Sequence, residues 1–559
     1  MTAIERRVRT LLDMEPADRL RAIIDDDNAV ELVEAFPPQE LLVTIKRVGE
    51  SDALPLIELA SSSQLLFFCD VEWWIGDTLD AERILHWLEL LGACGDEKII
   101  QWLSAVDPDF FVTVLHKFMR VTKPDEGTDP ATIPGALPPY TIDGIYHFNF
   151  FGEDAHRILG RILFFFYHVK PDLFGRMMEG VVWEAGNETE ELAIRWRDGR
   201  LRDLGIPDYE EAVAVYRYLD ENRFRQLPLK EGPLKLRENE VPVHYPLVVA
   251  GSEGDLLIEA VGKITDPETI DGISQELAHL VNRVIVADQE DLADVDAMMR
   301  AAGKVRAVLS MGLEVLTGKD ANKAAEVLTE RWLLYVFQVG YSQALNLTRR
   351  IHKISASGLF KTVPECVDLL DEPLKRIVEG LKKPRPLWYV GGAEPYRFFN
   401  SIEEIKKAQK ALDVVEYLFS LFFEKLKLIE PDPESWTRKK VYRVDITFSV
   451  ILRTAFANAA AGRGFEYKAL GKSDIVALMD NAFENAPPGE DRKRRIKKDV
   501  KTDLVAYIEN LDPSAGEKEK EIRDIFVSDC IDFLDEELGR LDLEGNFSPR
   551  FIQGLLIKK

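Results

Sequence analysis

Two segments of the chain place a glutamate three residues before a histidine. They are Glu153 with His156, and Glu276 with His279. On a helix, positions i and i+3 share a face, and di-metal carboxylate bundles combine two such segments with two further glutamates. The pattern would suit a metal-carboxylate enzyme that holds iron, manganese or zinc. Structural or solvated histidines are the favoured interpretation, because a chain with 97 Asp and Glu residues produces this spacing by chance, and the metal site is the alternative.

A second group of reactive side chains is a set of arginines near Trp196. Guanidinium groups beside an indole can bind a phosphate or a carboxylate, which would suit an anion or phosphometabolite sensor. The candidate anion-binding residues are Arg195, Arg197, Arg200 and Arg202. Internal ion pairing is the simpler interpretation, because five acidic residues lie within helical reach. These are Glu188, Glu190, Glu191, Asp198 and Asp203.

Other catalytic patterns fail on spacing or on residue type. The segment 312–320 resembles a phosphate-binding loop, but it is one residue too long, and Asp320 stands where a Ser or Thr should bind Mg²⁺. Cys69 would need a nearby histidine base to act as a nucleophile, and a buried free thiol beside Trp73 and Trp74 is the simpler expectation. The sequence therefore identifies no catalytic or cofactor-binding residue. Whether the protein is an enzyme stays open, and the sequence favours a protein without catalysis.

The elements that would position these residues are mostly helices. Residues 402–428 carry apolar side chains at helical spacing, and Ser401 with Glu404 forms a capping box in front of them. Asp266 followed by Pro267 predicts another helix start. Residues 140–150 are the clearest strand signal, with a type I′ turn expected at Asp143 and Gly144. We expect a multidomain, mostly α-helical protein with one or two small hairpins.

Three proline-led segments in the first 120 residues read like repeats. Residues 35–45 are similar to residues 105–115, and residues 14–24 form a looser third copy. In each segment a proline opens a short helix with one aliphatic face, and such helices bury that face by stacking in series. The pattern predicts an N-terminal solenoid. It resembles the N-terminal helical domain of MgtE-type magnesium transporters.

Proline- and glycine-rich breaks divide the chain into helical blocks. Residues 122–139 form the clearest predicted linker, and further breaks occur at residues 221–246 and 382–395. The resulting blocks comprise residues 1–121, 140–226, 247–381 and 400–559. The second block would contain the hairpin.

Composition excludes several classes of protein. The formal net charge of −26 opposes nucleic-acid binding, and the one dense basic run, residues 492–498, has no interleaved aromatic residues for stacking bases. No apolar run reaches the roughly 20 residues that a bilayer requires, so no membrane insertion is expected. The four cysteines form no C-x-x-C pair. A cytoplasmic, acidic protein with reduced thiols fits these features.

Five short stretches together resemble a bacterial family known as a domain of unknown function. They are residues 66–74, 140–144, 195–203, 337–342 and 549–556. The resemblance covers nearly the whole chain and implies no activity or cofactor. Because stacked helices expose extended binding surfaces, we expect an interaction or scaffold protein without catalysis, whose partner is another protein. A metal-carboxylate enzyme and an anion sensor are the alternatives.

Overall fold

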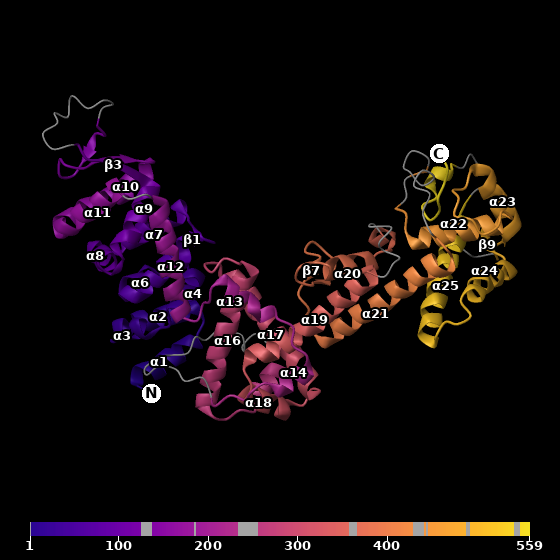
Figure 1. Ribbon diagram of the computed structural model, residues 1–559, viewed down its shortest axis with the longest axis horizontal. Coiled ribbons are helices and arrows are strands. Elements are labelled where there is room, and N and C mark those ends of the chain that lie inside the picture. The colour runs from indigo at the N-terminus through magenta and orange to yellow at the C-terminus, as the bar shows by residue number, and fades with distance from the viewer. Residues whose placement is uncertain are drawn as a thin grey trace. The chain divides into compact units, whose positions relative to one another are not determined.

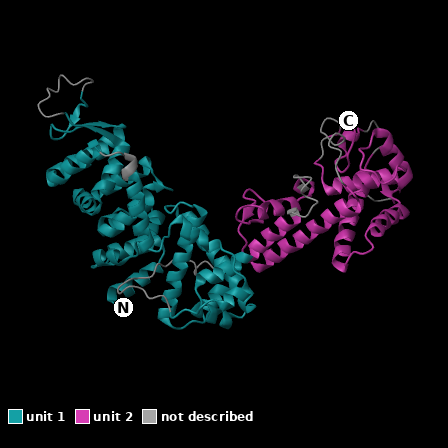
Figure 2. Ribbon diagram, viewed as in Figure 1, with its two compact units in different colours: residues 1–342 teal, residues 343–559 magenta. Residues whose placement is uncertain are grey.

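The computed structural model describes the chain except for residues 1, 125–136, 184–185, 233–254, 357–365, 429–440, 443–444, 488–491 and 542–547. The chain divides into two compact units, residues 1–342 (unit 1) and residues 343–559 (unit 2), as Figure 2 shows. Helices predominate in both units, so the predicted mostly α-helical fold is confirmed.

The predicted blocks can be compared with the two units. Blocks 1–121 and 140–226 lie in unit 1, block 400–559 lies in unit 2, and block 247–381 extends across residue 342. The finer division into four blocks stays a prediction. Most of the predicted linker 122–139 lies outside the described residues.

Unit 1 begins with a series of short helices, which Figure 1 shows stacked one after another. They are α1 (Ala3–Leu12), α2 (Pro16–Ile24), α3 (Ala29–Ala35), α4 (Pro38–Val48), α5 (Leu54–Leu59), α6 (Ser62–Glu72), α7 (Ala81–Ala93), α8 (Asp96–Ala105) and α9 (Pro108–Phe118). Pro16, Pro38 and Pro108 each begin a helix. Proline suits this position because the first N–H groups of a helix have no acceptor within the helix, so the N–H that proline lacks is not needed. All three proline-led helices of the predicted repeats are therefore present.

These helices contact one another in an alternating order. Helix α1 packs on α3, α3 on α5 and α5 on α7, while α2 packs on α4, α4 on α6 and α6 on α8. Odd-numbered and even-numbered helices therefore form two layers that share one hydrophobic core. This is the packing of an α-solenoid, as the repeats predict.

The predicted hairpin forms within a three-stranded sheet. Strand β4 (Tyr140–Thr141) pairs with β5 (His147–Phe150), and β3 (Met119–Thr122) pairs with the other edge of β5. The register leaves residues 142–146 as the loop, so the expected two-residue turn at Asp143 and Gly144 is wrong. Asp143 instead accepts the N–H groups of Ile145 and Tyr146, which favours a longer loop. A small hairpin, β1 (Trp74–Ile75) with β2 (Thr78–Leu79), joins α6 to α7.

The rest of unit 1 consists of further helices, some of which pack on the solenoid and others on one another. Its elements are α10 (Glu153–Val169), α11 (Pro171–Trp183), α12 (Gly186–Asp203), α13 (Tyr209–Val213), η2 (Ala214–Tyr216), α14 (Glu221–Gln226), α15 (Leu256–Val261), α16 (Pro267–Asp288), α17 (Val295–Thr317), α18 (Ala321–Glu330) and the start of α19 (Leu333–Ala356). Helix α12 packs on α6 and α9, and α16 packs on α13 and α17. The predicted start of α16 is confirmed, because Asp266 accepts the N–H of Thr269.

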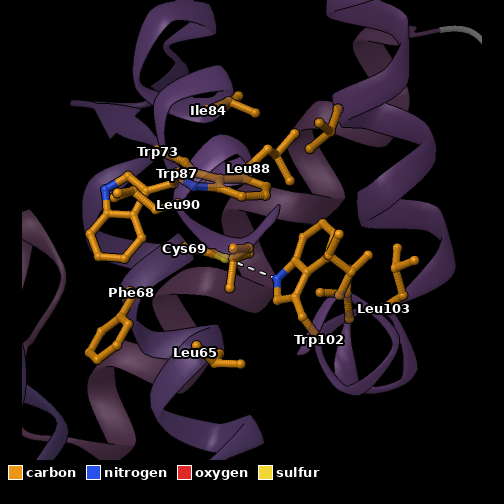
Figure 3. Packing of buried hydrophobic residues seen from close by; sticks show 14 of the residues in the cluster. Leu65, Phe68, Cys69, Trp73, Ile84, Trp87, Leu88, Leu90, Trp102 and Leu103 are labelled. Atoms are coloured by element: carbon orange, nitrogen blue, oxygen red, sulfur yellow. Dashed lines mark hydrogen bonds between the residues drawn. The ribbon is translucent and has the colours of Figure 1, made fainter. Parts of the chain in front are cut away.

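Aromatic side chains fill the middle of the solenoid core (Figure 3). Trp73 and Trp102 are both fully buried, with ring centroids 5.5 Å apart. The indole N–H of Trp102 donates to the sulfur of Cys69 at 3.2 Å, and Cys69 is 3% exposed. Burial raises the pKa of the Cys69 thiol, although the Trp102 hydrogen bond opposes this shift. The expectation of a buried structural cysteine is therefore confirmed.

Unit 2 combines helices with two small hairpins. After the end of α19 it contains η3 (Cys366–Leu369), α20 (Leu374–Leu381), β6 (Trp388–Tyr389), β7 (Tyr396–Arg397), α21 (Ile402–Phe419), the π-helical turn η4 (Ser420–Lys425), α22 (Phe448–Ala460), α23 (Lys472–Ala482), β8 (Phe483–Asn485), β9 (Arg494–Ile496), α24 (Lys498–Leu511), α25 (Glu517–Gly539) and η5 (Pro549–Phe551). Ser401 caps α21 by accepting the N–H of Glu404. The predicted capping box is incomplete, because the Glu404 carboxylate accepts from Asn400 and Arg397 instead. The basic run 492–498 lies around β9, and its Arg492 binds the buried Asp535 of α25 at 2.9 Å.

Candidate functional site

The first predicted metal-binding segment lies on the first turn of α10. The side chains of Glu153 and His156 are both exposed. The His156 ring stacks on Phe150 at a centroid distance of 4.9 Å and meets the edge of Tyr140 at 4.8 Å. This histidine therefore covers the small sheet and packs against its aromatic residues.

The second segment lies inside α16 and has different surroundings. Glu276 is 8% exposed, forms an ion pair with Lys230 at 2.5 Å and accepts the N–H of Leu333 at 3.0 Å. Burial raises the pKa of Glu276, while Lys230 opposes that shift. His279 lies within hydrogen-bonding distance of Gln275, and both Glu276 and His279 line a cavity of about 270 Å³.

The structure does not bring the two segments together. Helix α10 packs on α7, α8, α11 and β5, whereas α16 packs on α13, η2, α17 and α18. Among the described residues, no three His, Cys, Asp or Glu side chains converge as metal ligands. The geometry therefore offers no support for the di-metal site, and that site stays a prediction.

Three of the four candidate arginines on α12 form ion pairs within unit 1. Arg195 pairs with Glu191 on the surface at 2.6 Å, and Arg202 pairs with Asp208 at 2.6 Å. Arg200 binds both carboxylate oxygens of Asp70 at 2.8 and 2.6 Å, and Asp70 is 2% exposed. The Arg195 pair lies within α12, whereas the Arg200 pair attaches α12 to the solenoid and the Arg202 pair attaches it to the segment before α13.

Arg197 differs from the other three. Its side chain donates from Nε to the backbone oxygen of Asp70 at 2.8 Å, and from Nη1 to the backbone oxygen of Gly76 at 3.0 Å. Its guanidinium lies 5.0 Å from the ring centroid of Trp74, a cation–π contact. Although Arg197 is only 8% exposed, it forms no ion pair with any described residue. Burial lowers the pKa of Arg197, while nearby acids, Asp198 first, oppose the shift.

Arg197 lines a cavity of about 780 Å³, which we call the large cavity. It lies where the end of α6, the β1–β2 hairpin and α12 meet residues 206–210 and 286–292. Its apolar wall includes Trp74, Ile194, Leu201, Ile206 and Val286. A volume of this size, with an apolar wall and a few polar groups, is typical of a ligand site.

Carboxylates outnumber cations in the large cavity. Arg197 is the one basic side chain that lines it, against Asp77, Asp198, Asp208, Glu210, Glu290 and Asp291. Asp208, Glu290 and Asp291 form ion pairs, but Asp77, Asp198 and Glu210 form none with the described residues. Burial raises the pKa of Asp198, and Arg197 opposes that shift. The cavity therefore favours a cationic group over an anion such as phosphate.

A third cavity, of about 390 Å³, shares Asp291 with the large cavity and has about half its volume; we call it the small cavity. Lys46 lies between Glu50 and Glu72, at 2.8 Å from each, and Trp87 donates to Glu72 at 3.1 Å. His86 contacts Glu50 as well. Because most charges in the small cavity are paired with one another, the large cavity is the stronger candidate site.

Sequence reasoning identified only one residue of the large cavity, Arg197. It treated Asp198 as an ion-pair partner for the arginines and Trp74 as a core residue. No local signal relates the hairpin residue Asp77 to α12 or to the segment after α16, because these parts are far apart in the sequence. The stretches 66–74 and 195–203, which both contributed to the family resemblance, contain lining residues of the large cavity, but nothing in either stretch indicates that the two meet.

None of the helices in the described ranges has the length and apolarity needed to cross a bilayer. Searches of curated proteins and of solved structures each found no significant match. The resemblance to the MgtE helical domain therefore gains no support. A family model does match residues 1–558, and the chain belongs to the family of unknown function DUF6178.

Proposed function

We propose that the protein is a helical interaction protein whose large cavity binds a basic side chain of a partner protein. The observation that carries this proposal is the set of carboxylates in that cavity. Asp77, Asp198 and Glu210 line the cavity without ion-pair partners among the described residues. Asp198 is half-buried, whereas Asp77 and Glu210 are exposed at the cavity, and a guanidinium or ammonium group would form charge-assisted hydrogen bonds with them.

The walls of the large cavity suit the same ligand. Arginine and lysine carry an apolar stem below the charged group, and aliphatic and aromatic surfaces bind such stems. The net charge of −26 would also draw a basic partner toward the chain and slow its escape. These two electrostatic effects, the faster approach and the slower escape of the partner, weaken as salt concentration rises.

The test is calorimetric titration of the full chain with N-acetyl-Gly-Gly-Arg-amide at low salt. The matched ligand is the same peptide with citrulline in place of arginine, because citrulline keeps the shape and removes the charge. We expect the arginine peptide to bind at least about tenfold more tightly, which corresponds to one desolvated charge-assisted contact. Equal binding of the two peptides, or no binding, would refute the proposal.

Two variants of α12 locate the site. Asp198→Asn removes a half-buried carboxylate of the large cavity, and Asp203→Asn removes an exposed carboxylate of the same helix that does not line it. We expect the first to weaken binding of the arginine peptide and the second to leave it unchanged. If both variants weaken binding equally, the effect comes from overall charge, and the large cavity is not the site.

A further inference from the structure

Arg197 is a buried cation in a cavity rich in acids, yet no acid neutralises it directly. Its Nε and Nη1 groups donate to backbone oxygens of Asp70 and Gly76, and none of the described residues accepts a hydrogen bond from Nη2. The side chain is more than nine-tenths buried and lines the large cavity. Nη2 is not one of the fully buried polar atoms that lack a hydrogen-bond partner, so it reaches the open space of the large cavity, where an acceptor from a ligand takes the place of water.

The neighbouring Arg200 shows the contrast. Its Nε and Nη2 groups donate to the two carboxylate oxygens of Asp70, so this carboxylate pairs with Arg200 and not with Arg197. The position of Arg197 is held by its two backbone contacts and by its stacking on Trp74. Arg197 is therefore oriented before any ligand arrives, which lowers the entropy that binding must overcome.

We infer that Arg197 binds a carboxylate of the ligand, so that the large cavity accepts a carboxylate and a neighbouring cationic group together. This inference rests on the proposed function, which assigns the cationic group to Asp77, Asp198 and Glu210. The chemistry is that of an arginine or lysine at the C-terminus of a partner protein, or of the free amino acid. Planar guanidinium groups recognise carboxylates through paired hydrogen bonds, which makes this assignment specific.

The size and the charge of the large cavity agree with such a ligand. A volume of about 780 Å³ holds a complete terminal residue together with part of the preceding backbone. An anion alone would meet Arg197 and also the six surrounding carboxylates, which repel it. A ligand that carries both charges satisfies Arg197 and the unpaired acids at once.

The experiment compares N-acetyl-Gly-Gly-Arg with its C-terminal amide, and free arginine with argininamide, by calorimetric titration of the full chain. The members of each pair differ mainly in the carboxylate. We expect the acid to bind at least about tenfold more tightly than the amide in one or both pairs. Tighter binding of the tripeptide acid than of free arginine identifies a protein terminus as the source, and the reverse identifies the amino acid.

The outcomes separate this inference from the proposed function. If the amides bind and the acids bind no more tightly, the inference about Arg197 is wrong, while the cationic site stands. If neither form binds, both are wrong. Arg197→Gln should abolish the preference for the acid but retain binding of the amide. Should that variant not fold, the acid-to-amide ratio of the unmodified chain decides the question alone.

Discussion

The crossing of α17 and α19 depends on two glycines that face each other, Gly312 and Gly340. A Cβ atom at Gly312 would lie 2.2 Å from the backbone oxygen of Val336, and one at Gly340 would lie 2.1 Å from that of Val308. Real Cβ atoms do not approach backbone oxygens closer than about 3 Å, so an alanine at either position would push the two backbones apart by about 1 Å.

The expected magnitude follows from two opposing effects. A separation of this size removes a quarter to a half of the van der Waals attraction across the crossing, and overpacking of this kind costs about 1–3 kcal/mol or more. Against this, alanine has a higher helix propensity than glycine by about 1 kcal/mol. We expect Gly312→Ala to lower the free energy of unfolding by about 2 kcal/mol, because the clash involves rigid backbone on both sides.

The control lies on the same helix. A Cβ atom at Gly303 of α17 would meet nothing within 4 Å, so Gly303→Ala keeps only the helix-propensity gain and should stabilise the protein by about 0.5–1 kcal/mol. Urea unfolding of the full chain, followed by circular dichroism, measures both variants through the midpoint at constant slope. The reasoning fails if Gly312→Ala is neutral or stabilises the chain as Gly303→Ala does.

Two further predictions concern charged groups in unit 1. Asp70→Asn leaves Arg200 without its carboxylate partner and should lower the free energy of unfolding by about 2–3 kcal/mol. Glu89→Gln, which breaks an exposed pair with Arg157, should leave the free energy of unfolding nearly unchanged; comparable losses for the two variants in urea unfolding would contradict the distinction. Burial lowers the pKa of His116, so its contribution to stability is complete above the unfolded value of about 6.5 and is lost as pH falls through the folded value. His116→Gln should flatten the thermal-stability profile between pH 7 and pH 5, and a profile identical to that of the unmodified chain would refute this.

Local chemistry explains why many helices were predictable. Proline at the first helical position and Asp or Ser at the N-cap act within three residues of the helix start, so Pro108 with α9 and Asp266 with α16 can be read from the sequence. The repeat of such starts also predicts stacking, because each short helix has an apolar face that it cannot bury alone. The hairpin was predicted as well, but its loop was not, because Asp143 caps a longer turn.

The pairing of charges was beyond local reasoning. Arg200 has acidic neighbours along α12, yet it binds Asp70, which lies 130 residues earlier in the chain. The spacing of Glu153 with His156 and of Glu276 with His279 says nothing about the distance between the two segments, because they lie on helices with different packing partners. A short motif fixes the face of a helix on which its residues lie but leaves open what that face meets.

The amino-acid sequence by itself determined the helical class of this protein, the starts of many helices, the repeated stacking at the N-terminus and the membership in a family. Each of these depends on interactions between residues that are close along the chain, or on a pattern spread over all of it. Only the tertiary structure decided that Arg197 lies buried without an acid partner, beside Trp74 and among six carboxylates. The physical reason is that burial and the electrostatic environment depend on which distant segments pack together.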